Sequence, residues 1–64
     1  MIRLTGMNKK ELILNAEHIE KIEQTPESII TLLNGNKYIV MESCEEIIKK
    51  VIEYKRQIFV NNVS

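Results

Sequence analysis

The 64-residue sequence has one cysteine, no aspartate and no long apolar run, and each shortage excludes a class of protein. Because Cys44 has no partner for an internal disulfide, the chain lacks the cross-links that stabilise small secreted domains. Without aspartate, it lacks the residue on which calcium-binding loops rely. A membrane-spanning helix needs about 18 consecutive apolar residues, which are absent. Residues 1–5 also lack the layout of a secretion signal, so the sequence predicts a cytoplasmic protein without membrane insertion.

An excess of charge of either sign is missing too, since nine basic and nine acidic residues give a formal net charge of zero. The two signs also balance within residues 1–41 and within residues 42–64. Nucleic-acid binding takes most of its affinity from a basic surface that neutralises phosphates. We therefore expect no nucleic-acid partner, and the local basic candidates are Lys9, Lys10 and Lys37. A net charge near zero also favours self-association.

Short apolar runs, separated by Gly6, Pro26 and Gly35, fill the first 41 residues. Alternation of apolar and polar residues, together with these turn formers, predicts strands connected by hairpins. The expected strands are residues 2–5, 12–14, 19–25, 28–33 and 36–41. Residues 15–18 predict a turn or a single helical turn between the second strand and the third.

The second hairpin turns around Asn34 and Gly35, with Gly35 at a left-handed corner. A loop with an odd number of residues groups apolar side chains on one face, namely Ile30, Leu32, Tyr38 and Val40. We expect this face to lie beneath the C-terminal helix. The opposite face carries Ile29, Thr31, Leu33, Lys37, Ile39 and Met41. It is too apolar for simple exposure to water, which predicts a covering partner.

A capping box predicts the start of the helix, because Ser43 and Glu46 can each satisfy a free amide of the first turn. We expect the helix to span residues 43–59. The expected surface ion pairs are Glu45–Lys49 and Glu46–Lys50. The apolar stripe of the helix consists of Cys44, Ile47, Ile48, Val51, Ile52, Ile58 and Phe59. Burial of this stripe is expected to outweigh the small ion-pair energies.

These elements predict an α+β fold in which a small antiparallel β-sheet of four to five short strands is packed by one C-terminal amphipathic helix. Residues 1–59 are expected to form a single small domain, and residues 60–64 a frayed tail. A domain of this size has a thin core. A second copy of the chain is the simplest cover for the open sheet face, so we expect a homo-oligomer.

The sequence offers no constellation for catalysis or for binding a metal or cofactor. Structural zinc needs four Cys or His ligands, and the chain has one of each, His18 and Cys44. Cys44 lies on the apolar stripe, where cysteine behaves as a small hydrophobic residue. The glutamates lie beside lysines in positions typical of a solvated surface. We therefore expect a protein that is not an enzyme, with no catalytic, metal-binding or cofactor-binding residues.

The sequence resembles the FlbD-like flagellar protein family from residue 1 to about residue 59. The matching stretches are residues 1–5, 14–20, 25–32, 34–43 and 52–56. The chain departs from the family at Met7-Asn8-Lys9, where members usually show an Asn-Gly turn. A lysine at that left-handed corner is strained, which favours a different loop for the first hairpin.

The resemblance implies a small cytoplasmic protein that is needed for motility and has no catalytic activity. In the swarming branch of the family, it implies support of flagellar motor power through the torque-generating stator components. We expect the open sheet face to contact a second copy or a motor component. The expected interface residues are Ile29, Leu33, Ile39 and Met41. The alternative function is a small β-rich regulator that binds nucleic acid through the three lysines named above.

Overall fold

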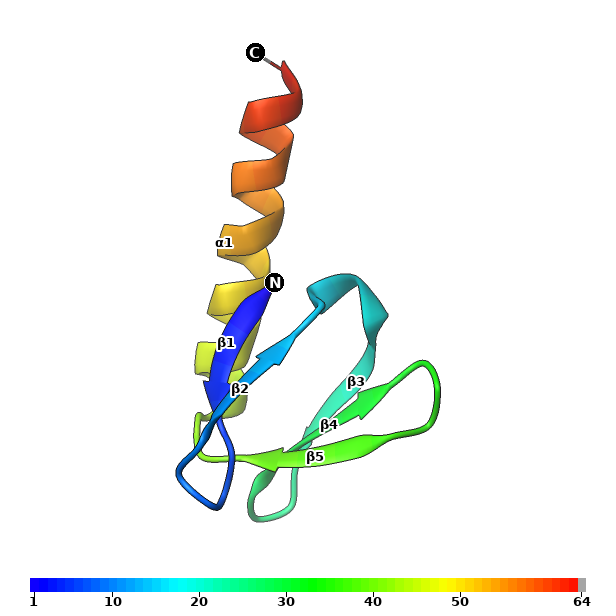
Figure 1. Ribbon diagram of the computed structural model, residues 1–64, viewed down its shortest axis with the longest axis vertical. Helices are drawn as coiled ribbons and strands as arrows, with labels where there is room; N and C mark the ends of the chain where they lie inside the picture. The colour runs from blue at the N-terminus through cyan, green and yellow to red at the C-terminus, as the bar shows by residue number, and fades with distance from the viewer. Residues whose placement is uncertain (64) are drawn as a thin grey trace.

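The computed structural model describes the backbone of residues 1–63 and the side chains of residues 1–58. Its fold is α+β, as predicted, with antiparallel strands followed by one C-terminal helix (Figure 1). The elements are β1 (Ile2–Thr5), β2 (Glu11–Leu14), the 3₁₀ helix η1 (Ala16–His18), β3 (Ile19–Gln24), β4 (Ser28–Leu32), β5 (Lys37–Val40) and α1 (Cys44–Val63). Every strand begins and ends within one residue of its predicted bounds. The strands form two sheets rather than one, a β1-β2 pair and a three-stranded sheet in the order β3-β4-β5.

The β1–β2 and β4–β5 hairpins turn through loops of the same shape. Three residues form each loop, and the third has a positive φ, which is 66° at Lys9 and 92° at Gly35. The middle residue is an asparagine whose side-chain oxygen accepts the backbone N–H two residues later, at 3.0 Å in both loops. The odd loop predicted around Gly35 is confirmed. The expectation of a different first loop is wrong, because Asn8 makes the same turn-stabilising bond and the chain accepts the strain at Lys9.

The core lies between the two sheets and the start of α1. Its buried apolar side chains are Ile2, Leu4, Leu14, Ala16, Ile30, Val40 and Ile47. The prediction that the helix covers the inner face of β4 and β5 is therefore wrong in part, because strands β1 and β2 contribute three of these seven core residues and the helix contributes one. Ile47 is the one fully buried side chain that α1 contributes within residues 44–58. Leu32 and Tyr38 are partly buried against the edge of this core.

Helix α1 begins with the predicted capping box. The Ser43 hydroxyl accepts the Glu46 backbone N–H at 3.2 Å and donates to Glu46 Oε1 at 3.3 Å. The two predicted ion pairs along the helix are not formed, and Glu46 is engaged by Ser43 instead. Within residues 1–58, the one ion pair joins Lys21 Nζ to Glu23 Oε1 at 3.7 Å.

The helix is longer than the sheets beside it. It contacts β1 and β3, and its C-terminal half projects beyond both sheets (Figure 1). It ends at Val63, so the backbone of residues 60–63 is helical where a frayed tail was predicted; Ser64 lies outside the described residues. Half of the stripe residues whose side chains are described are exposed, namely Ile48, Ile52 and Ile58. The predicted stripe residue Phe59 lies outside the described side chains.

Backbone bonds between distant residues join the two sheets at one corner. Gly6 forms a β-bridge with Val40, and the Met41 N–H donates to the Thr5 carbonyl at 2.8 Å. The Gln24 side-chain oxygen accepts the Cys44 N–H at 3.2 Å, which ties the end of β3 to the start of α1. These bonds fold the β1–β2 hairpin over the inner face of the three-stranded sheet, which explains why the hairpin takes the place predicted for the helix.

Candidate protein-contact face

The outer face of the three-stranded sheet presents apolar side chains at its centre. Ile30 points into the core, so its neighbour Ile29 faces outward, since strand side chains alternate. Ile39 on β5 is the direct cross-strand partner of Ile29, and Glu23 on β3 flanks it on the other side. Ile29 is half-buried, whereas Ile39 exposes 46% of its surface. We call this outer face of β3, β4 and β5 the contact face, and the two isoleucines form its middle.

The other two predicted interface residues lie at opposite ends of this hairpin. Met41 directly follows β5 and is 56% exposed. Leu33 is 63% exposed, but it lies in the loop between β4 and β5, where its backbone N–H donates to the His18 carbonyl at 2.8 Å. The sheet therefore brings Ile29 and Ile39 together with Met41 close by in sequence, and it places Leu33 at the far end.

A polar row separates Leu33 from the two isoleucines. Thr31 on the central strand pairs with Lys21 on β3 and with Lys37 on β5. Thr31 is buried, and its hydroxyl oxygen has no hydrogen-bond partner among residues 1–58. The two lysines give this end of the contact face positive charge, which Glu23 reduces through its ion pair with Lys21.

A hollow extends from Ile39 toward the β1–β2 hairpin. Its volume is about 490 Å³, and its apolar lining consists of Met7, Leu12, Tyr38 and Ile39. Lys10 and Glu11 supply charges at the same hollow. Sequence reasoning missed Met7, which is 55% exposed. No local pattern could have found it, because the Gly6–Val40 bridge is what brings its loop to the edge of β5.

The histidine and the cysteine lie on different elements. His18 is exposed in η1, and Cys44 is half-buried at the start of α1. Within the residues that the structure describes, no three His, Cys, Asp or Glu side chains gather as a metal site would require. The pKa of the Glu42 carboxyl lies below its ordinary value. Burial alone would raise this pKa. Hydrogen bonds from Thr5 and from the Glu42 backbone N–H, together with the Lys50 charge, lower it by more than burial raises it, so the net shift is downward.

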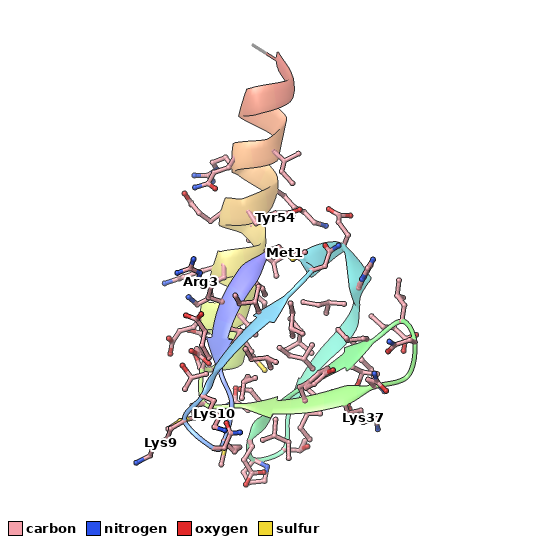
Figure 2. All side chains as sticks on the ribbon, in the orientation of Figure 1. Met1, Arg3, Lys9, Lys10, Lys37 and Tyr54 are labelled. Carbon is pink, nitrogen blue, oxygen red and sulfur yellow. The ribbon has the colours of Figure 1, made fainter. Side chains whose placement is uncertain are left out.

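The three lysines proposed for nucleic-acid binding do not form one patch. Lys9 and Lys10 extend from the loop between β1 and β2, whereas Lys37 lies at the start of β5, away from that loop (Figure 2). A phosphate backbone needs several cations along one surface. The arrangement therefore gives no support to the nucleic-acid alternative.

The family comparison covers nearly the whole fold. A family model described as flagellar and swarming motility proteins, FlbD, matches residues 1–59. The chain belongs to the FlbD family. The predicted resemblance is thus confirmed, and the matched range includes every strand and all four predicted interface residues. No curated protein and no solved structure matches the chain. Over the described residues, α1 has no stretch long and apolar enough to cross a lipid bilayer.

Proposed function

We propose that this FlbD-family protein acts in the cytoplasm as a non-enzymatic accessory of the flagellum, by binding another protein through the contact face. The observation that carries the proposal is the exposure of Ile39 and Met41 beside half-buried Ile29. Fully burying a large aliphatic side chain is worth about 1.5–3 kcal/mol, so covering the remaining surface of these three can drive a specific contact.

We propose that the partner is a component of the flagellar motor, at its torque-generating machinery. Family membership supports the link to flagella and swarming. The contact face supports a binding role, because a mixed surface with apolar residues at the centre and charges at the rim is typical of protein interfaces. A second copy of the chain is the other partner that this face could take, and the solution mass separates the two.

The test replaces Ile39 by lysine in a strain that lacks the native protein. Ile13 offers a matched control, because it is a strand isoleucine with 52% exposure on β2, outside the contact face. We expect Ile39→Lys to abolish rescue of swarming and Ile13→Lys to retain it, with both variants folded by circular dichroism. Normal swarming with folded Ile39→Lys, or equal loss in both variants, would refute a role for the contact face.

Two further measurements test whether the partner is a second copy of the chain and whether the protein acts on motor torque or on filament assembly. Light scattering on the wild-type protein and Ile39→Lys shows whether the face joins two copies; a mass that falls to the monomer supports self-association. Rotation of cells tethered by one filament reports motor torque. Low torque with a normal number of filaments in the deletion strain supports action on the motor, whereas missing filaments would instead indicate a role in assembly.

A further inference from the structure

A second surface lies where α1 runs past β1. A groove of about 520 Å³ opens between them, lined by Met1, Arg3, Lys49, Lys50, Glu53 and Tyr54 among others. Figure 2 shows Met1 and Arg3 at the start of β1, beside the part of the helix that carries Tyr54. None of the lining residues belongs to the contact face, so this groove is independent of the proposed function.

The groove carries an excess of positive charge in a chain whose formal net charge is zero. Arg3, Lys49 and Lys50 contribute three cations, against the single carboxylate of Glu53. The side chains of all three cations are exposed, and none takes part in an ion pair within residues 1–58. The charges of Arg3 and Lys49 are therefore available to an incoming anionic group, whereas the Lys50 charge also acts on the Glu42 carboxylate.

The same groove offers apolar contacts between its charges. Met1 is 64% exposed, and Tyr54 is half-buried against the core. Beneath them, Ile2 is buried and is held in place by its pairing with Leu14. A methionine side chain and a tyrosine ring can together pack against one apolar side chain of a ligand. Methionine is flexible enough to adapt to its shape, and tyrosine offers a large apolar ring.

We propose that this groove binds an acidic peptide segment of a partner protein. One apolar side chain of the segment packs on Met1 and Tyr54, while neighbouring carboxylates pair with Arg3 and Lys49. Charge complementarity favours an acidic segment over a basic one. Tyr54 is half-buried whereas the cations are exposed, so a single peptide side chain can reach its ring more readily than a flat lipid surface can.

The test measures binding of a fluorescein-labelled dodecapeptide of glutamates with one central phenylalanine, by fluorescence anisotropy at low salt. We expect saturable binding that weakens as salt is raised, because the cations are exposed and screened. The variant Arg3→Glu with Lys49→Glu should weaken binding roughly tenfold or more, since it turns two attractive charges into repulsive ones. The matched control, Lys9→Glu with Lys10→Glu, reverses two exposed cations outside the groove and should change affinity less than about twofold.

Further peptides separate the parts of the proposal. Replacing phenylalanine by serine should weaken binding, and replacing the glutamates by glutamines should abolish it. Ile39→Lys should leave peptide binding unchanged, so failure of the contact face and failure of the groove give different results. The proposal is overturned if the glutamate peptide does not bind at low salt, or if both charge reversals weaken binding equally. It is also overturned if vesicles with anionic lipids bind through Arg3 and Lys49 while the peptide does not.

Discussion

Thr5 holds both carboxylate oxygens of Glu42. Its backbone N–H donates to Oε1 and its hydroxyl donates to Oε2, each at 2.9 Å. The Thr5 carbonyl in turn accepts the Met41 N–H at 2.8 Å. Three hydrogen bonds thus join the end of β1 to the segment that connects β5 with α1. Because this segment fixes where the helix starts, the Thr5–Glu42 contact positions both the β1–β2 hairpin and the helix.

The Glu42 contact predicts a dependence of stability on pH. The pKa of Glu42 in the folded protein lies below its ordinary value of 4.5, so the ionised carboxylate stabilises the fold above that value. This contribution is lost as the pH falls through the lower, folded pKa. We expect Glu42→Gln to lower the free energy of unfolding by about 1.5 kcal/mol at neutral pH, the low end for a charged hydrogen bond that is partly exposed. Urea denaturation should show the difference shrinking toward pH 2; an equal loss at both pH values would contradict it.

Neighbouring isoleucines on α1 give a second prediction. Ile47 is 0% exposed and Ile48 is 47% exposed, although both belong to the apolar stripe predicted from sequence. Ile47→Ala should cost about 2–4 kcal/mol, because it removes buried methyl groups and leaves a cavity. Ile48→Ala should change stability by less than about 0.5 kcal/mol. Thermal unfolding followed by circular dichroism compares the two variants. Similar melting temperatures would mean that the helix packs through a different face.

The strands and the start of the helix could be predicted because their signals are local. The Asn34-Gly35 turn sets the register of β4 and β5, and the Ser43–Glu46 capping box sets the first turn of α1. The packing of these elements depends on contacts between distant residues. The Gly6–Val40 bridge has no sequence signature, yet it decides that the β1–β2 hairpin covers the inner sheet face.

The candidate site also has one part that local sequence signals predict and another that depends on contacts between distant residues. Strand alternation alone predicts that Ile29 and Ile39 share the outer face, and their direct pairing confirms it. Alternation also assigns Leu33 to that face, but the chain has already entered the loop at Leu33 and is held by His18. The hollow beside Met7 and the groove beside Tyr54 combine residues from distant parts of the chain. Period-2 and helical patterns cannot reveal such combinations.

The two similar hairpin loops predict that glycine is the favoured residue at the left-handed position of each. Lys9 occupies the left-handed position that Gly35 occupies in the other loop. Lys9→Gly should stabilise the protein by about 0.5–1 kcal/mol, because relief of the strain exceeds the added freedom of the unfolded chain. Gly35→Ala should destabilise by about 1 kcal/mol for the same reason, although no atom lies within 4 Å to clash with the added methyl group.

A control for the loop prediction is Lys10→Gly, since Lys10 is exposed and does not have a positive φ. Only the cost of glycine in the unfolded chain remains there, so we expect a loss of about 0.5–1 kcal/mol. Chemical denaturation of the three variants provides the measurement. Destabilisation by Lys9→Gly as large as that by Lys10→Gly would show that Lys9 bears no strain.

Thr31 gives a prediction about the contact face itself. Its side chain is buried between the pairing positions of Lys21 and Lys37, and its hydroxyl has no hydrogen-bond partner among residues 1–58. A buried hydroxyl without a partner costs about 1–3 kcal/mol, and valine replaces it by a methyl group of nearly the same shape. Thr31→Val should therefore stabilise the isolated protein by about 1 kcal/mol in urea denaturation, whereas Thr31→Ser, which keeps the hydroxyl and loses the methyl group, should destabilise it. A loss of stability in Thr31→Val would mean that the hydroxyl has a hydrogen-bond partner in solution.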